Sequence, residues 1–310
     1  MSRIIDGNSI GYAAQNTRKL TNDGMEVQAV YQSLRTLKSI RYQKSSFGDD
    51  IWLWDGIAKF RYDEYPDYKG TRDNDPKMKE MREAYKEARP ILSKGLELLG
   101  VRQVTAPNFE ADDVAGFLVR RAAAKNKPCL LITGDRDWLQ LVQSNPSIEW
   151  HDPRKQPGRS CTFKTFKSQT GFEAATQFLE AKAIEGDKSD NIEGVMGLGP
   201  KACEAIMQTY GGVRELAKVY RAQGEFTKEN IPKTLSRYRN PLNRFLKEDV
   251  KTFTRNYRLM NLLTAERDEM IKSDISVVKG KKDMTAFKEY CHDLNFLSIV
   301  REIDKWEALF

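Results

Sequence analysis

The sequence predicts an α/β protein whose central sheet is mostly parallel and flanked by helices, followed by a largely helical region. In the first half, short apolar runs alternate with longer segments of helical periodicity, which is the pattern of successive β-α-β units. The apolar runs show no polar alternation, as is typical of strands that are covered on both faces. From about residue 163 onward the pattern becomes mostly helical.

The elements of this fold are expected in a simple order. Strands are expected within four apolar runs, at residues 3–6, 51–56, 101–109 and 128–135. Helices are expected between them, within residues 25–40, 77–100 and 111–126. We therefore predict an α/β core over residues 1–164 and a helical region over residues 165–310. Within the second region, breaks are expected at a glycine-rich hairpin, 194–199, and at a polar stretch, 221–232.

Composition narrows the classes of function. The net charge of +7 over 310 residues modestly favours an anionic partner. The chain has two histidines, which argues against a histidine-based zinc site and against a Ser-His-Asp triad. Four cysteines occur without a CxxC pair, as in reduced intracellular proteins, and no run approaches the roughly 20 apolar residues of a membrane helix. We expect a cytoplasmic location, in the host cytoplasm if a phage encodes the chain.

Aspartates follow three of the predicted strands. Asp6 follows the first strand, Asp55 the second, and Asp135 with Asp137 the strand that ends near residue 133. Because ligands of open α/β sheets gather beyond the carboxyl ends of the strands, these side chains are expected at one edge of the sheet. An Asp before a Gly is also ordinary turn chemistry, which is the structural alternative for Asp6 and Asp55.

Further acids occur in two short clusters. Glu110, Asp112 and Asp113 stand at the expected start of a helix, and Asp187 and Asp190 repeat the spacing of three. Acids in a first helical turn also act as caps, so each cluster alone has a structural explanation. Together, converging carboxylates repel one another unless cations neutralise them or some are protonated. An all-oxygen site of this kind suits two or more Mg²⁺ or Mn²⁺ ions.

Four segments follow one another along the chain: FRYDEYPDYKGTRD, FEADDVAGFL, ITGDRDWLQL and AIEGDKSDNIEGVMGLGPKACEAI. In this order they resemble the 5′-nuclease family, which comprises phage 5′-exonucleases, flap endonucleases and the 5′-nuclease domain of bacterial DNA polymerase I. The resemblance runs from residue 6 to about residue 210. It implies a PIN-like or resolvase-like core with a helix-hairpin-helix region, and, as no polymerase portion follows, the stand-alone phage type.

The resemblance assigns roles to particular residues. It implies metal binding, in two neighbouring groups, by Asp6, Asp55, Glu110, Asp112, Asp113, Asp135, Asp137, Asp187 and Asp190. It implies that Lys69 acts as an electrophile on the scissile phosphate with help from Arg72. Tyr68 is expected to stack on a base, although a core tyrosine is the alternative. Residues 72–100 are expected to form an arch over the active site, with basic residues such as Lys86 facing DNA.

The glycine-rich hairpin precedes a helix that opens with Pro200 and Lys201. Gly194, Gly197 and Gly199 allow the backbone to approach a phosphate, which would sit on the free N–H groups at the helix start. After the GDKSDNI segment this is the helix-hairpin-helix pattern, a clamp on duplex backbone that is insensitive to base sequence. A potassium ion on the hairpin carbonyls is a further expectation from such motifs.

The sequence therefore predicts a magnesium-dependent, structure-selective 5′ nuclease. The expected partners are DNA with 5′ flaps, nicks or free ends and, as a second substrate, RNA in RNA–DNA hybrids; the protein is expected to be a monomer. Two alternatives stay open. A PIN-like ribonuclease also gathers acids at strand ends, and a metal-stabilised DNA clamp would bind without cutting.

Overall fold

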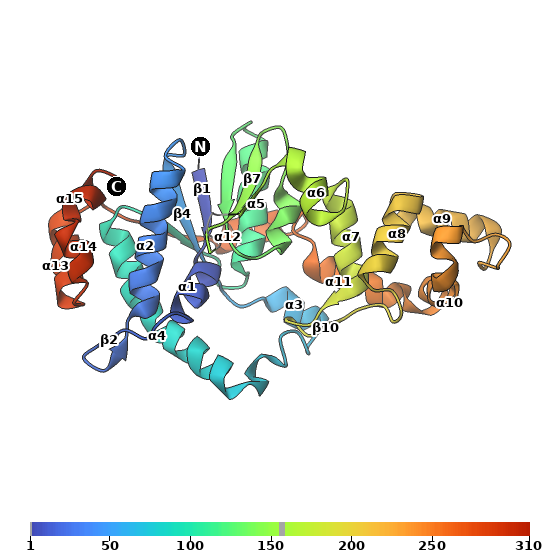
Figure 1. Ribbon diagram of the computed structural model, residues 1–310, viewed down its shortest axis with the longest axis horizontal. Helices are drawn as coiled ribbons and strands as arrows, with labels where there is room; N and C mark the ends of the chain where they lie inside the picture. The colour runs from blue at the N-terminus through green and yellow to red at the C-terminus, as the bar shows by residue number, and fades with distance from the viewer. Residues whose placement is uncertain (1, 155–158) are drawn as a thin grey trace.

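The computed structural model describes residues 2–154 and 159–310. Figure 1 shows an α/β core with helices α8, α9 and α10 extending from one end and the C-terminal helices α13 to α15 at the other. Among the described residues, no helix combines the length and apolar character needed to span a membrane. All four cysteines are free and buried, in agreement with the expectation of reduced thiols.

A seven-stranded sheet forms the centre of the core, in the order β11-β5-β4-β1-β6-β7-β8. Its five inner strands are parallel: β1 (Ser2–Asp6), β4 (Asp49–Trp54), β5 (Arg102–Thr105), β6 (Cys129–Ile132) and β7 (Ile148–Asp152). Its two edge strands are antiparallel: β8 (Arg159–Cys161) and β11 (Ser276–Lys279). The four predicted strands are confirmed, whereas β7, β8 and β11 were not anticipated. Two short hairpins, β2 (Thr21–Asn22) with β3 (Met25–Glu26) and β9 (Gly186–Asp187) with β10 (Ile192–Glu193), lie outside the sheet.

Helices cover both faces of the sheet, which is why its strands are apolar without alternation. Neighbouring residues of β1 show this: Ile4 belongs to the apolar cluster with α5, and Ile5 to the cluster with α1, α2 and α4. The helices are α1 (Gly7–Gln15), α2 (Gln28–Gln43), α4 (Pro76–Leu98) and α5 (Ala111–Ala123). The predicted helices are thus confirmed, and α1, which follows β1 directly, was missed.

The helical region contains a separate apolar cluster that joins α8, α9 and α10. Its helices are α6 (Phe166–Thr170), α7 (Ala175–Glu185), α8 (Pro200–Tyr210), α9 (Val213–Gln223), α10 (Arg239–Arg244) and α11 (Val250–Met260). Helix α11 packs against α7 and returns the chain toward the core, beside α3 (Lys59–Glu64). The mostly helical pattern predicted beyond residue 163 is confirmed.

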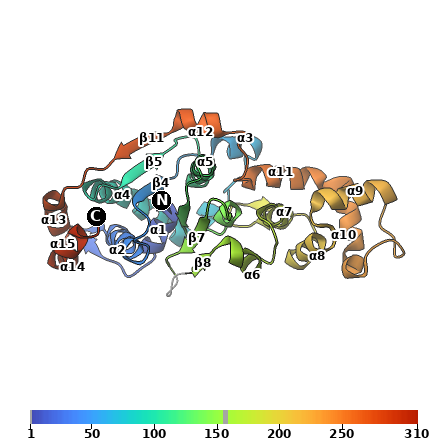
Figure 2. The same ribbon diagram turned by 90° about the horizontal axis from the view of Figure 1, so that it is seen from above.

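The last part of the chain packs on the core rather than on the helical region. After α12 (Asp268–Asp274), strand β11 pairs with β5, as Figure 2 shows. The terminal helices α13 (Met284–Asp293), α14 (Leu297–Arg301) and α15 (Ile303–Glu307) then join the apolar cluster of α2 and α4. The expected division at residue 164 therefore does not separate two bodies in space, because residues 276–310 belong to the core. The packed C-terminal helix expected from the apolar spacing is present.

Candidate active site

The parallel strands bring acids to one edge of the sheet. Asp6, the last residue of β1, pairs with Leu53 near the end of β4. The residue before it, Ile5, pairs with Ile132 at the end of β6. Asp55 directly follows β4, and Asp135 follows β6 by three residues. The register therefore places all three aspartates beyond the carboxyl ends of adjacent strands, as predicted.

Local hydrogen bonds hold the first two aspartates. The Asp6 carboxylate caps α1 by accepting a hydrogen bond from the backbone N–H of Ser9, at 2.9 Å, and another from Thr133 Oγ1, at 2.7 Å. The Asp55 carboxylate accepts from the backbone N–H of Ala111 in the first turn of α5, at 2.8 Å. Asp6 thus also has a structural role as the cap of α1, and Asp55 also anchors the first turn of α5.

The start of α5 adds two more carboxylates, Asp112 and Glu110, beside the third strand-end aspartate, Asp135. Asp112 accepts a hydrogen bond from Trp138 Nε1 at 2.7 Å, which fixes it beside the strand-end acids. Asp135 accepts from the backbone N–H of Asp137 at 2.8 Å. Glu110 is the N-cap residue of α5 and is buried. The start of α5 and the segment after β6 are distant in sequence, and the fold brings them together.

The β9–β10 hairpin supplies the second acidic group. Asp187 accepts hydrogen bonds from the backbone N–H and hydroxyl of Ser189, at 2.8 and 2.6 Å. Asp190 accepts from Arg72 at 2.7 Å and from the hydroxyl of Tyr68 at 2.9 Å. The hairpin therefore ties the segment before α4 to the end of α7.

A single cleft of about 530 Å³ collects these residues. Eight of the nine predicted acids line it: Asp6, Asp55, Glu110, Asp112, Asp135, Asp137, Asp187 and Asp190. Lys69 and Arg72 line it as well. The convergence expected from the strand ends and the two acidic clusters is thus present.

Asp113 is the exception, and its expected metal role is corrected. It does not line the cleft, because both of its carboxylate oxygens accept hydrogen bonds from the guanidinium of Arg61, at 2.6 and 2.9 Å. Its carboxylate also accepts from the backbone N–H of Glu110, completing a capping box at the start of α5. Arg61 itself is 3 % exposed and donates to the carbonyl of Leu259 at 2.9 Å. Asp113 thus stabilises a buried arginine that joins α3, α5 and α11.

Tyr68 is also corrected. Its side chain is 3 % exposed, and its hydroxyl donates to Glu110 as well as to Asp190, each at 2.9 Å. A ring held in this way cannot stack on a base, and the alternative of a core tyrosine holds. The structural effect of Tyr68 is to bridge the two acidic groups from below the cleft wall.

Lysines and arginines already neutralise part of the cleft. Lys69 forms an ion pair with Glu110, and Arg72 pairs with Asp190 at 2.7 Å. Lys182 of α7 pairs with Asp137 and lies 3.5 Å from Asp187. The sequence interpretation missed Lys182, although its place five residues before Asp187, one turn from the end of α7, was a usable signal. Arg136 and Arg154 also line the cleft.

The negative charges of the other cleft acids are only partly neutralised by neighbouring cations. Burial and the charge of Asp55 raise the pKa of Asp6 to about 6. Desolvation by the cleft walls and the charge of Asp137 raise the pKa of Asp135 to about 7. Burial likewise raises the pKa of Asp55 and, with the charge of Asp135, that of Asp112. Four neighbouring carboxyl groups therefore resist ionisation in the absence of an added cation.

Glu110 behaves differently from these four. Burial alone would raise the pKa of Glu110, but the charges of Arg61 and Lys69 outweigh it and lower the pKa. Glu110 is therefore ionised at neutral pH and is held by two cations, one on each side. A ligand that draws Lys69 away leaves Glu110 partly unpaired and available to another cation.

The donor set fits hard divalent cations. No three acidic, histidine or cysteine side chains of the described residues stand in a ready coordination arrangement. The chemistry of the cleft nevertheless consists of carboxylate oxygens whose raised pKa values show missing positive charge, and such oxygens are the ligands that Mg²⁺ and Mn²⁺ prefer. The ion pairs of Lys69 and Lys182 occupy some of the oxygens that an ion would need.

The hairpin beside the cleft has the predicted helix-hairpin-helix form. Helix α7 leads into residues 186–199, and α8 begins at Pro200 with Gly199 as its N-cap. A side chain at Gly194 would collide with the carbonyl of Glu185, and Gly197 has a φ of +83°. These two positions explain the need for glycine. Gly199 and Lys201 are exposed at the start of α8, where free N–H groups point outward.

The segment before the core part of α4 corresponds to the expected arch. Residues 65–75 leave α3 and reach the exposed first turns of α4, below the core in Figure 1. The second half of α4 is packed on the core through buried residues such as Tyr85 and Leu92. An arch over residues 72–100 is therefore too long, because only the first part of that range is free of the core. Lys86 is exposed but does not line the cleft.

Comparison with known proteins establishes the family. A family described as "5′-3′ exonuclease, N-terminal resolvase-like domain" matches residues 2–171, more than half of the chain. The chain belongs to the 5′-3′ exonuclease family. A 5′-3′ exonuclease of Aquifex aeolicus is 27 % identical over 307 residues, covering 97 % of this chain and 94 % of that protein. A thermostable DNA polymerase I of Thermus filiformis is 30 % identical over 217 residues, covering 69 % of this chain and 24 % of the polymerase.

Solved structures of low identity share the fold of this exonuclease-family chain. A bacteriophage T5 flap endonuclease, crystallised as a pseudo-enzyme–product complex with DNA and metal ions, aligns with a TM-score of 0.65 at 21 % identity and covers 99 % of both chains. The catalytic core of Rad2 in complex with DNA substrate aligns with a TM-score of 0.66 at 13 % identity, covering 100 % of this chain and 92 % of that one. The resolvase-like core and the mostly parallel sheet are therefore confirmed.

Proposed function

We propose that this protein is a magnesium-dependent, structure-selective 5′ nuclease that hydrolyses phosphodiester bonds at 5′ ends or flaps of DNA. The observation that carries the proposal is the single cleft in which eight carboxylates from distant segments meet beside a helix-hairpin-helix. The similar proteins, a 5′-3′ exonuclease and a flap endonuclease crystallised with DNA and metal ions, support the same reaction class. A role in replication or repair and a second activity on RNA–DNA hybrids rest on family resemblance.

Two groups of residues would hold the metal. The first group comprises the strand-end and α5 acids, Asp6, Asp55, Glu110, Asp112 and Asp135. The second comprises Asp137, Asp187 and Asp190. When bound, divalent ions in such a cleft supply water activation and charge neutralisation at the phosphate.

Lys69 and Arg72 would bind the scissile phosphate. Each of these cations forms an ion pair with a carboxylate of the cleft. When DNA binds, each can exchange that carboxylate for a phosphate oxygen and so remain paired with an anion throughout. Lys69 has a φ of +58°, and its backbone N–H donates to the carbonyl of Asp190 at 2.8 Å, which holds its ammonium group at the cleft. A preorganised cation at a phosphate stabilises the charge that develops in the transition state.

Lys182 would act as an internal counterion of the second acidic group. Its ammonium lies between Asp137 and Asp187, where it offsets their mutual repulsion. A divalent ion that binds these two acids must compete with Lys182, so occupancy of the second group is expected to be weaker than that of the first. Lys182 released from Asp137 can then meet DNA phosphate at the same edge of the cleft.

The helix-hairpin-helix would hold the duplex beside the cleft. The free N–H groups at the start of α8 and the side chain of Lys201 form a phosphate site that is insensitive to base sequence. Gly194, Gly197 and Gly199 keep this approach open. A potassium ion on the hairpin carbonyls stays a prediction; one of these carbonyls, that of Met196, already accepts a hydrogen bond from Arg244.

One experiment tests the proposal. End-labelled flap, nicked and blunt DNA duplexes are digested with and without Mg²⁺, together with RNA–DNA hybrid and single-stranded RNA. We expect Mg²⁺-dependent products from the 5′ end of the branched or nicked DNA, and none from Asp135→Asn, which still binds DNA. Cleavage confined to RNA would favour the PIN-like ribonuclease instead. Binding of DNA without cleavage by the wild-type protein in Mg²⁺ or Mn²⁺ would favour the inert clamp.

A further inference from the structure

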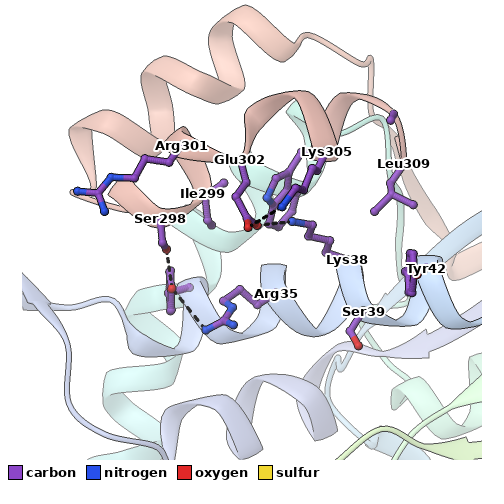
Figure 3. Close-up of a pocket in the computed structure, with 13 residues that line it drawn as sticks. Arg35, Lys38, Ser39, Tyr42, Ser298, Ile299, Arg301, Glu302, Lys305 and Leu309 are labelled. Carbon is purple, nitrogen blue, oxygen red and sulfur yellow. Dashed lines mark hydrogen bonds and ion pairs between the residues drawn. The ribbon is translucent and has the colours of Figure 1, made fainter.

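A second, larger cavity lies between α2 and the C-terminal helices. It measures about 870 Å³ and is shown in Figure 3. One wall is α2, with Arg35, Lys38 and Tyr42, and the other is formed by α14, α15 and the last residues of the chain. We call this the C-terminal pocket. None of the described residues lines both this pocket and the acidic cleft.

The rim of the C-terminal pocket is strongly basic. Four cations line it, Arg35, Lys38, Arg301 and Lys305, against one acid, Glu302. Lys38 and Lys305 both bond to Glu302, at 2.8 and 3.1 Å, so that carboxylate is fully used. Within residues 2–154 and 159–310, no acid lies within ion-pair distance of Arg35 or Arg301. The rim therefore carries uncompensated positive charge on both of its walls.

The floor of the pocket is apolar and rigid. Trp306 is 1 % exposed and is fixed between Phe287 and Phe310, with ring centroids 5.4 and 5.7 Å away. Ile299 is buried beside it, at 2 % exposure. Tyr42 at the mouth is 75 % exposed and presents an aromatic ring at the edge of the pocket. The cavity is thus preformed and does not need to open for a ligand.

We propose that the C-terminal pocket binds an acidic segment of a partner protein that inserts one or two apolar side chains between its carboxylates. The apolar side chains would fill the pocket between α2 and α15, over Ile299 and beside Lys38, whose ammonium lies over the Trp306 ring at 5.1 Å. The carboxylates would pair with Arg35 and Arg301. Aromatic residues and arginine around a desolvated centre are typical of the residues that dominate binding energy at protein interfaces. Opposite charge on the rim sets the orientation of the segment and speeds its association.

The shape of the pocket favours a peptide over a nucleic acid. A duplex presents phosphates on a convex ridge and has no apolar group that would fill a partly enclosed pocket with an apolar floor. A peptide satisfies both features at once, since it alternates charged and apolar side chains along one strand or helix face. The pocket would therefore attach the protein to a partner while leaving the cleft free, and this inference does not depend on the proposed nuclease activity.

The test uses fluorescence anisotropy with labelled peptides of about twelve residues. The first peptide combines several Asp and Glu with a central Phe-Leu pair; the second replaces the acids by Ser, and the third replaces Phe-Leu by Ala-Ala. We expect the first to bind with a Kd on the order of 10 μM at low salt, and both controls at least tenfold more weakly. The affinity of the first peptide should fall as salt is raised.

Variants of the protein locate the binding. Arg35→Glu with Arg301→Glu should weaken the first peptide at least tenfold, while Lys125→Glu with Lys127→Glu, an equal charge change on an exposed segment elsewhere, should not. Ser39→Trp, which fills the cavity without changing charge, should weaken it as well. Circular dichroism of each variant verifies folding, and cleavage of a protein-free flap substrate should be unchanged in all three.

Two results would overturn the proposal. One is a first peptide that binds no better than its controls, or equally well to the double charge-reversal variant. The other is a labelled duplex of about 20 base pairs that loses affinity in the Arg35 and Arg301 variant while no peptide binds. That second outcome would assign the pocket to nucleic acid.

Discussion

The charge of the cleft predicts that Asp6→Asn stabilises the metal-free protein and removes most of the stabilisation that Mg²⁺ provides. Asp6 is 5 % exposed and close to Asp55, and its pKa is raised from 3.8 to about 6. Because the folded-state pKa lies above the unfolded value, ionised Asp6 disfavours folding. This penalty is absent below pH 3.8, grows between pH 3.8 and 6, and is complete above pH 6.

The magnitude follows from the size of the shift. A difference of about two pKa units corresponds to about 3 kcal/mol at pH 8. For a chain of this length, 1 kcal/mol changes the melting temperature by roughly 2 °C, so Asp6→Asn should raise that of the metal-free protein by up to about 6 °C. Asparagine retains one oxygen, which can accept from the backbone N–H of Ser9, so the cap of α1 is preserved; the hydrogen bond that Thr133 Oγ1 donates to the second oxygen of Asp6 is lost. Mg²⁺ should give the wild-type protein a similar gain at pH 8 and a much smaller one at pH 5.

Differential scanning calorimetry at both pH values, with a chelator or with Mg²⁺, measures these shifts. Asp304→Asn, at an exposed position of α15, is the matched control and should leave the Mg²⁺ effect intact. The reasoning is refuted if metal-free Asp6→Asn melts no higher than the wild-type protein at pH 8. An Mg²⁺ effect of equal size at pH 5 and pH 8 would also contradict it, because protons and metal ions would then not compete for the same carboxylates.

Three further outcomes follow from the ion pairs. Lys69→Ala should lower the single-turnover cleavage rate of a flap substrate about a hundredfold, while the Kd for DNA, measured by fluorescence anisotropy, should change much less. An unchanged cleavage rate would exclude a contact between Lys69 and the scissile phosphate. Lys182→Met should tighten Mn²⁺ binding to the second acidic group several-fold, which a titration followed by electron paramagnetic resonance would measure. Unaltered binding would mean that Lys182 does not compete with the metal. Arg61→Met should lower the free energy of unfolding, measured by urea denaturation, by about 3–5 kcal/mol. The reason is that Asp113 and Glu110 remain buried without the guanidinium that they share. A loss below about 1 kcal/mol would show that the ion pairs of Arg61 do not stabilise the fold.

The sequence alone was sufficient for the strands β1, β4, β5 and β6, for the helices α2, α4 and α5, and for the edge at which the acids meet. Strands such as β4 and β6 are apolar throughout because helices cover both faces, and that pattern is visible without coordinates. The acids that follow them must lie together because parallel strands share one carboxyl edge. Asp6, Asp55 and Asp135 were placed correctly for this reason.

Pairing between side chains was decided only by the tertiary structure. Asp113 and Asp112 are adjacent in sequence and identical in type, yet α5 turns one toward Arg61 and the other toward the cleft. Tyr68 and Lys69 are likewise neighbours, and one is buried beneath the cleft while the other enters it. In α5 a one-residue step rotates a side chain by about 100° around the helix, so small errors of phase reverse the assignments of Asp112 and Asp113. Tyr68 and Lys69 lie in a turn, where the backbone conformation of Lys69, with a φ of +58°, separates the two side chains.

Contacts between residues that are distant in sequence could not be predicted from the sequence either. Lys182 meets Asp137 across 45 residues, and β11 reaches β5 across more than 170. Local propensity carries no information on such contacts, because they form only when packing of the whole core makes up for the entropy of closing long loops. The sequence by itself thus determined which residues are chemically able to bind metal and phosphate. The folded chain decided which of them share a cleft, which are neutralised by a neighbouring cation, and how α2 and the C-terminal helices enclose a second pocket.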